Sequence, residues 1–199
     1  FRATGQGGVL NNHSASLESA GGMALNFGQI NNVNDHFSLE NVLVSREQIS
    51  EYEVEHLKNG VRYNDKDYKI YIYQDEVNIL CIEGVICHTT DGDRFTHYAY
   101  TRTITEDRVK ETDPGKIIAG GNLSITAGNI LNDKSQIIAG GALAIQAGSV
   151  DNVEVKANRQ INDVGTATFY SRHQKKGGDS SRVETSDYKP PTVIQGITL

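Results

Sequence analysis

Hydrophobic and polar positions alternate in short runs along this chain, and two neighbouring runs are near-copies of each other. The segment KIIAGGNLSITAGNILNDKSQ is followed by the similar segment QIIAGGALAIQAGSVDN. Aliphatic residues recur at an interval of 20 positions, so Leu123 matches Leu143 and Ile125 matches Ile145. A fixed repeat of roughly 20–50 residues is typical of repeat architectures. The sequence therefore predicts a structure built from stacked, similar units.

The polarity pattern within one repeat predicts a strand. Leu123, Ile125 and Ala127 alternate with Ser124 and Thr126, which places the apolar side chains on one face. Glycines before and after this run permit sharp backbone turns, and they leave no room for an amphipathic helix. We therefore expect an all-β fold, a parallel β-helix with turns of about 20 residues. The sequence does not fix the hand, but the strong preference for right-handed crossovers favours a right-handed coil.

In such a coil, each strand pairs with its equivalent one turn away, at a spacing of roughly 4.8 Å. The predicted stacks are Leu123 on Leu143, Ile125 on Ile145, and Asn132 on Asn152 as a short amide ladder. A looser copy of the repeat covers residues 16–32, and VIQGITL at the end of the chain begins another strand. We expect about four turns, cut from a longer protein.

Composition changes sharply between the turns. Residues 33–115 hold 17 acidic and 9 basic residues, whereas the chain as a whole has a net charge of −6. Seven of the nine tyrosines lie between Tyr52 and Tyr100. We therefore predict four parts. These are β-helix turns at 1–34, an inserted helix with antiparallel strands at 35–114, two turns at 115–152, and a polar loop at 153–199 that returns to a β-helix strand.

The inserted part carries both helix and strand signals. Ser45 and Gln48 have the spacing of a capping box, and apolar residues follow at helical spacing from Ile49 to Leu57, which predicts one short α-helix. Runs at 68–73, 77–82, 85–89 and 94–105 are rich in β-branched and aromatic residues and predict an antiparallel meander.

Two cysteines, Cys81 and Cys87, lie in this meander. On one straight strand they would be about 20 Å apart, too far to bond. A turn at Glu83 and Gly84 would instead let them face each other as a disulfide, which suits an exported protein. The alternative is a pair of buried free thiols. Their spacing, with no histidine pair nearby, argues against zinc.

Three motifs carry a resemblance to a known family. They are DPGKIIAGGNLSITAGNILNDKSQIIAGGALAIQAGSVDN, TATFYSRHQKKGGDSS and DYKPPTVIQGITL. Together they resemble the repeat region of filamentous-haemagglutinin-type exoproteins, which include the CdiA effectors of contact-dependent growth inhibition. The resemblance covers roughly the last 90 residues. The middle of the chain fits the family only as a variable insertion, and its cysteine pair departs from the family pattern.

The resemblance implies a structural role. Such proteins leave Gram-negative bacteria through an outer-membrane two-partner secretion transporter, and they form right-handed β-helical filaments on the cell surface. In CdiA-type members the filament also carries a region that binds a receptor on a neighbouring cell, and a toxin. The resemblance therefore implies a filament segment that presents a toxin or an adhesive region. A host-directed adhesin filament is the alternative.

The tyrosines of the insertion are candidates for partner contact, because tyrosine is favoured at interfaces. The candidates are Tyr63, Tyr68, Tyr71, Tyr73, Tyr98 and Tyr100. The opposing interpretation, which we favour, is that these rings pack into the seam between the meander and the coil.

Other functions find little support in the sequence. Some β-helix proteins act on polysaccharides with clustered carboxylates, but the carboxylates here fit solvated turns, so we expect no enzyme, cofactor or metal. The net charge of −6 argues against a nucleic-acid partner. Apolar runs stay well short of the roughly 18 residues of a membrane span, so we expect no membrane insertion by this segment.

Overall fold

The computed structural model describes residues 1–57, 60–74, 77–87 and 92–199. Almost all of them lie in strands or the connections between strands, so the prediction of an all-β fold is confirmed. The chain divides into two compact units. The coil unit comprises Phe1–Val42, Asp107–Asn158 and Gly196–Leu199, and the sheet unit comprises Leu43–Glu106 and Arg159–Gln195.

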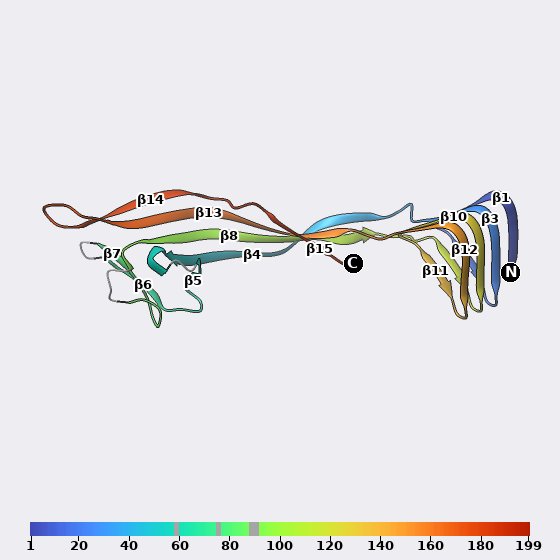
Figure 1. The fold of residues 1–199 in the computed structure, drawn as a ribbon, viewed down its shortest axis with the longest axis horizontal. Coiled ribbons are helices and arrows are strands. Elements are labelled where there is room, and N and C mark those ends of the chain that lie inside the picture. The colour runs from blue at the N-terminus through green and yellow to red at the C-terminus, as the bar shows by residue number, and fades with distance from the viewer. Residues whose placement is uncertain (58–59, 75–76, 88–91) are drawn as a thin grey trace. The chain divides into compact units, whose positions relative to one another are not determined.

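The coil unit is built from parallel strands. Its larger sheet has the order β1-β3-β10-β12, and its smaller sheet the order β11-β9-β2. The strands are β1 (Arg2–His13), β2 (Ser16–Ser19), β3 (Met23–Val33), β9 (Lys116–Ala119), β10 (Leu123–Asp133), β11 (Gln136–Ala139) and β12 (Leu143–Val153). Figure 1 shows strands from the two halves of the chain, blue and orange, stacked side by side in this unit.

The pairing register within the coil unit follows the sequence repeat. Leu123 lies opposite Leu143 and Ile125 opposite Ile145, at the interval of 20 residues. On its other side, β10 pairs with β3, and Ile125 lies opposite Leu25, at an interval of 100 residues. The chain therefore leaves the stack after β3 and returns to it at β9 and β10 in register.

The core of the coil unit is a thin layer of aliphatic side chains. Leu25, Leu123 and Ile125 are each no more than 2% exposed. Leu143 and Ile145 are 48% and 40% exposed, because β12 is the outer strand of its sheet. Burial of an aliphatic side chain contributes about 1.5–3 kcal/mol, so the inner strands gain far more from stacking than the outer one.

The sheet unit is antiparallel where its strand registers are defined. Its main sheet has the order β14-β13-β8-β4-β5, with β15 also pairing with β13, and a separate hairpin joins β6 to β7. These strands are β4 (Ser38–Val54), β5 (Arg62–Asn64), β6 (Ile70–Gln74), β7 (Asn78–Ile82), β8 (Phe95–Glu111), β13 (Ala157–His173), β14 (Ser180–Tyr188) and β15 (Val193–Ile197). β4, β8 and β13 each begin or end in the coil unit.

A second core lies in the sheet unit. Val54 and Phe95 from the main sheet pack with Leu80 and Ile82 from the hairpin, and all four are buried. Tyr170 adds a stacked ring, with its centroid 4.5 Å from that of Phe95. The hairpin is therefore fixed to one face of the main sheet by ordinary hydrophobic packing.

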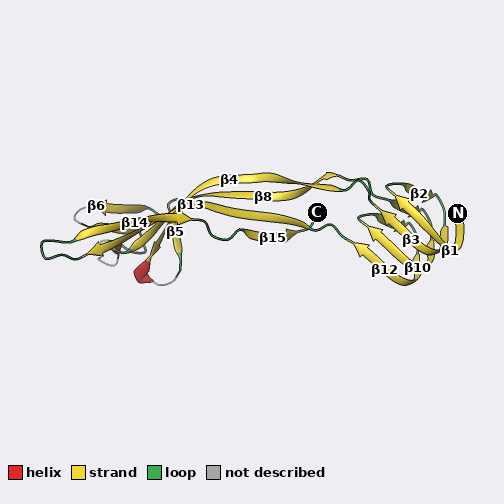
Figure 2. Cartoon of the chain, turned by 90° about the horizontal axis from the view of Figure 1, so that it is seen from above, coloured by secondary structure: helices red, strands yellow, loops and turns green. Residues whose placement is uncertain are grey.

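The predicted α-helix after Ser45 is wrong. β4 continues as a strand to Val54, and only a 3₁₀ turn, η1 (Glu55–Leu57), follows. Figure 2 shows η1 as a short red segment near β5. The reason is that β4 pairs with β8. Tyr52 and Val54 alternate with acidic residues along β4 and pack into the core of the sheet unit. These tertiary contacts stabilise the strand more than the capping spacing of Ser45 and Gln48 stabilises a helix.

The predicted polar loop at 153–199 is also wrong over most of its length. β13 and β14 form a long antiparallel pair, in which Thr168 lies opposite Thr185, and only the short segment between His173 and Ser180 connects them. The threonines and aromatic residues at 166–170 are good strand formers, and the run of two lysines and two glycines at 175–178 lies in the turn. The strand-like run at 85–89 lies partly outside the described residues.

None of the helical segments in the described ranges has the length and hydrophobicity needed to cross a bilayer.

Candidate interaction surfaces

An amide ladder runs through the coil unit. Asn12 donates from Nδ2 to Oδ1 of Asn32, Asn32 donates to Asn132, and Asn132 donates to Asn152, each over 2.7 Å. Asn32 is fully buried, and its Nδ2 also donates to the carbonyl of Gln136 over 3.0 Å. The predicted Asn132–Asn152 stack therefore lies in a ladder of four residues. Its role is structural, because it satisfies buried polar groups along the direction of stacking.

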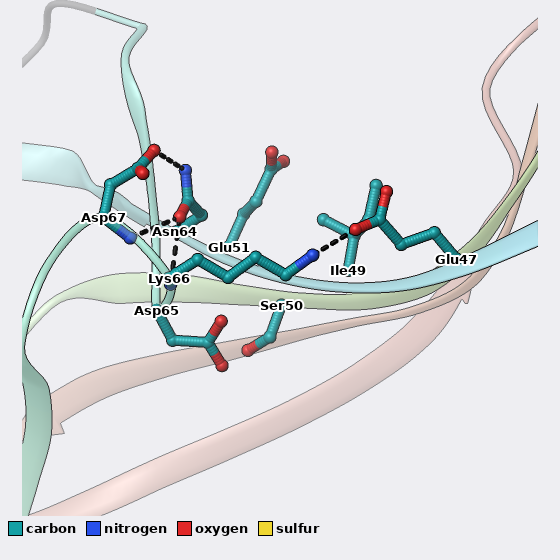
Figure 3. A pocket seen from close by; sticks show the side chains of 8 residues that line it. All are labelled: Glu47, Ile49, Ser50, Glu51, Asn64, Asp65, Lys66 and Asp67. Carbon is teal, nitrogen blue, oxygen red and sulfur yellow. Dashed lines mark hydrogen bonds and ion pairs between the residues drawn. The ribbon is translucent and has the colours of Figure 1, made fainter.

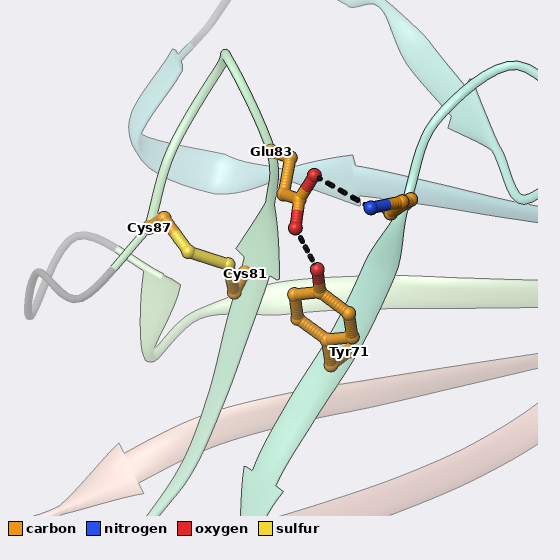
Figure 4. Close-up of a disulfide and its surroundings, with 5 residues drawn as sticks. Tyr71, Cys81, Glu83 and Cys87 are labelled. Carbon is orange, nitrogen blue, oxygen red and sulfur yellow. Dashed lines mark hydrogen bonds and ion pairs between the residues drawn. A yellow bond between two sulfur atoms is a disulfide. The ribbon is translucent and has the colours of Figure 1, made fainter.

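Cys81 and Cys87 form a disulfide, with their Cα atoms 4.2 Å apart. The chain turns between them at Gly84, whose φ of 80° lies in the left-handed region. In Figure 4, Tyr71 donates its hydroxyl to the carboxylate of Glu83 on this turn. That hydrogen bond raises the pKa of Tyr71 and lowers the pKa of Glu83. The disulfide closes the turn, and the hydrogen bond from Tyr71 holds it against β6.

The six candidate tyrosines lie in three places. Tyr68, Tyr71 and Tyr73 are 38–39% exposed, and the rings of Tyr71 and Tyr73 lie 6.2 Å apart on the hairpin. We call the last two the hairpin pair. Tyr63 is buried in the core of the sheet unit, with its ring edge-on to that of Tyr68. Tyr98 and Tyr100 lie on β8. The structure thus does not bring all six rings together.

Tyr100 belongs to a charged network on β8 and β13. Arg102 donates to both carboxylate oxygens of Asp163, over 2.9 and 2.8 Å, and to the hydroxyl of Tyr100 over 3.3 Å. Tyr100 in turn donates to Glu51 over 3.0 Å. Burial, with added effect from Glu51, raises the pKa of Tyr100 to about 12. The hydrogen bond with Asp163 raises the pKa of Arg102.

A second part of this network lies around Arg62. Its guanidinium lies 3.7 Å from the ring centroid of Tyr98 and donates to the hydroxyl of Tyr188 over 2.9 Å. Tyr98 donates to Glu53 over 3.1 Å. Sequence reasoning missed Arg62 and Tyr188, which are 126 positions apart, because their contact depends on the strand order of the main sheet.

An acidic cavity of about 180 Å³ lies where β5 meets β4. In Figure 3, Lys66 forms an ion pair with Glu47, and Asn64 accepts from the backbone of the turn that follows it. The hydrogen bond with Lys66 lowers the pKa of Glu47. Asp65 and Asp67 also line the cavity. Across the described ranges, no cluster of three or more histidines, cysteines and carboxylates is arranged to hold a metal.

Ser50 and His97 form a pair that resembles a catalytic dyad. The Ser50 hydroxyl lies 2.9 Å from Nε2 of His97, and the imidazole stacks on Tyr52 with centroids 4.4 Å apart. Burial lowers the pKa of His97. A catalytic triad also needs a carboxylate bonded to the other ring nitrogen. Among the described residues none makes that bond, so the arrangement fits a cross-strand contact.

The parallel strands, their register and the asparagine ladder define a β protein built from stacked repeats. The chain belongs to the haemagglutinin repeat family, whose pattern matches residues 2–45 and 109–179. These ranges include the strands of the coil unit and also β13. Membership supports an adhesin-like segment of a filamentous exoprotein, secreted or held at the cell surface. Comparison with curated proteins and with solved structures gives no match.

Proposed function

We propose that this chain is a filament segment of a secreted bacterial exoprotein, in which the coil unit is a right-handed parallel β-helix with turns of about 20 residues. The observation that carries the proposal is the pairing register, with Ser124 opposite Ala144 one repeat away and opposite Ala24 100 residues away. A stack that tolerates a long insertion without losing register can extend and stiffen a surface protein, because each turn depends only on its neighbours.

Engineered cysteines test this register directly. Equivalent residues on neighbouring strands lie roughly 4.8 Å apart, within reach of a disulfide, whereas a shift of two residues takes them beyond it. We expect Ala24→Cys with Ser124→Cys to form a disulfide, detected by mass spectrometry of peptides from the oxidised protein. Ala24→Cys with Thr126→Cys is the matched control. Equal cross-linking in both proteins would contradict the stacked coil.

We further propose that the sheet unit contacts a partner of the filament, such as a receptor on a neighbouring cell, through the hairpin pair. Tyr71 and Tyr73 are exposed, while Ile70 and Ile72 on the other face of the same strand pack into the core. The two rings are thus presented by a strand that is fixed from behind. Rigid, exposed tyrosines suit recognition, because little conformational entropy is lost on binding.

Cell binding tests this contact. Replacing Tyr71 and Tyr73 by alanine should reduce the binding of the protein to target cells at least about fivefold, measured at a temperature where circular dichroism shows the variant to be folded, because loss of the hydrogen bond from Tyr71 to Glu83 also lowers its melting temperature. Val183→Ala is the control, since Val183 on β14 is 50% exposed and lies outside the hairpin. Unchanged binding by the double variant would exclude this surface.

Within this role, we propose a CdiA-type effector of contact-dependent growth inhibition, exported by two-partner secretion. The repeat match and the resemblance of the three sequence motifs support this assignment. A host-directed adhesin is the alternative. A competition assay separates them: bacteria that carry the parent protein should inhibit the growth of neighbouring bacteria lacking immunity. Binding to host cells without inhibition of neighbours would favour the adhesin.

We propose a non-enzymatic role for this segment. A β-helix enzyme that acts on polysaccharides would need paired carboxylates about 5–10 Å apart around a substrate cleft. In the acidic cavity, Glu47 is neutralised by Lys66, and Asn64 bonds to Asp67. Release of reducing sugar from polysaccharides by the purified chain would contradict this part of the proposal.

A further inference from the structure

The main sheet of the sheet unit ends at an open strand, β14. The strand order places β14 outermost, with β13 on its inner side, and none of the strands in the described ranges pairs with its outer side. In Figure 1, β14 is the red strand along the border of this sheet. The outward-facing backbone N–H and C=O groups of β14 are therefore available to pair with another strand.

β14 lacks the features that usually protect an edge strand. Proteins shorten such strands, interrupt them with prolines or bulges, or place lysines on them. β5, at the opposite edge, has only three residues, whereas β14 has nine and pairs with β13 without a register shift. Its sequence, SSRVETSDY, contains no proline or lysine, and residues 182–187 are all exposed. This edge is therefore long, regular and accessible.

The two charges in the middle of β14 suit pairing with a copy of the same strand. Arg182 and Glu184 lie two residues apart, on the same face of the strand, and form an ion pair with each other. If two β14 strands pair antiparallel about Val183, Arg182 of each copy lies opposite Glu184 of the other. Opposite charges directly across a strand pair stabilise it, and like charges destabilise it. This register therefore adds two favourable charge pairs.

Charge also selects this register over its neighbours. In the register centred on Val183, this residue lies opposite itself, and the serine and threonine residues on either side face one another. Centring the pair on Glu184 or on Arg182 would instead bring two like charges together. Pairing ends where Asp187 meets Asp179 of the other copy. One register, which pairs residues 180–186, is thus preferred.

We propose that β14 binds a second copy of this chain, as an antiparallel pair about a two-fold axis at Val183. The two main sheets then form one continuous sheet through backbone hydrogen bonds. Each copy uses its β14 edge in the pair, so the product is a closed dimer. The interface is small, and we expect a weak dimer with a Kd of roughly 1–100 µM. The proposal goes beyond the filament role, because such a pair would join two filament segments.

The hairpin leaves the middle of this edge uncovered. Asn78 of β7 donates its backbone N–H to the hydroxyl of Ser181 over 2.6 Å. This contact lies at one end of the strand, and Val183 beyond it is 50% exposed. The hairpin therefore fixes the end of β14 while the residues that carry the proposed pairing stay accessible.

A charge exchange, measured by sedimentation equilibrium of the whole chain, tests the proposal. Arg182→Glu makes both positions acidic and Glu184→Arg makes both basic, so each variant alone should dimerise at least about tenfold more weakly than the parent. An equimolar mixture of the two should dimerise about as well as the parent, because opposite charges face each other again. Arg46→Glu, at an exposed position on β4, is the matched control and should change the Kd less than about twofold. Circular dichroism checks that each variant is folded.

Cysteine cross-linking tests the centre of the register. Val183→Cys places two thiols opposite each other, with Cα atoms roughly 4.5–5.5 Å apart, within reach of a disulfide. Thr185→Cys lies on the same face, but its copy would be more than about 10 Å away. The native cysteines, Cys81 and Cys87, are already bonded to each other. We therefore expect covalent dimers on non-reducing gels from Val183→Cys and few from Thr185→Cys.

Three results would overturn the proposal. The first is a parent chain that stays monomeric up to about 300 µM, above the expected Kd. The second is dimerisation of the single charge variants as strong as that of the parent, which association through the coil unit would produce. The third is equal cross-linking of the two cysteine variants.

Discussion

Replacing Asn32 by alanine should destabilise the coil unit far more than the same change at Asn152. Asn32 is fully buried and makes three hydrogen bonds: it accepts from Asn12 and donates to Asn132 and to the carbonyl of Gln136. At about 0.5–1.5 kcal/mol for each bond, the loss is about 2–4 kcal/mol. Asn152 is exposed and accepts one bond from Asn132, so its replacement should cost about 1 kcal/mol or less.

Amide hydrogen exchange measured on peptides from β3 and β10 tests this difference. If exchange occurs through opening of the coil unit, lowering its free energy of unfolding by about 2–4 kcal/mol raises the exchange rate roughly 30- to 1,000-fold. Replacing Asn152 by alanine should raise the exchange rate less than roughly tenfold. Gly115→Ala should resemble Asn32→Ala, because a Cβ at Gly115 would lie 2.6 Å from Oδ1 of Asn32. Equal effects of the two asparagine variants would refute the argument that burial sets the strength of the ladder.

Three further predictions concern the sheet unit. Cys81→Ser with Cys87→Ser should lower its unfolding free energy by about 2 kcal/mol in urea denaturation, since the disulfide closes a short loop. Gly165→Ala should lower the melting temperature of the sheet unit, because a Cβ there would overlap the backbone of Tyr100. Burial lowers the pKa of His97 in the folded protein. As the pH falls, His97 is therefore protonated in the unfolded chain at a higher pH than in the folded protein. Stability from this group is present above about pH 6.5 and lost as pH falls below it, and His97→Gln should reduce that loss in thermal melts at pH 7.5 and 5.

The parallel pairing in the coil unit was predictable because its information is local and repeated. The apolar alternation of Leu123 and Ile125 recurs at Leu143 and Ile145, and the observed register is the same interval of 20 residues. A strand that pairs with a copy of itself needs no other partner to specify its position. The near-identity of the two segments therefore fixed both the element type and its neighbour.

The sheet unit could not be predicted to the same extent, because its strands pair with unlike segments far away in sequence. Ser45 and Gln48 have a helix-capping spacing, yet β4 pairs with β8 and with β5 and is held as a strand. Likewise, Phe169 and Tyr170 come shortly before a run of lysines and glycines that is typical of a loop, but β13 includes both aromatic residues and ends at His173. Local propensity is a weak guide where long-range pairing decides.

The same contrast explains why the candidate surfaces lie in the sheet unit. In the coil unit, side chains of the inner strands are committed to stacking, and changes there must be accommodated by the turns on both sides. In the sheet unit, Tyr98 and Tyr188 come from strands on either side of β13 and meet over Gly165 and Ala167, where small residues leave room for rings. Because the inserted segment returns the chain to the coil unit in register, the exposed residues of the sheet unit can change in sequence without shifting that register. Recognition can therefore change in the sheet unit without disturbing the stack that carries it.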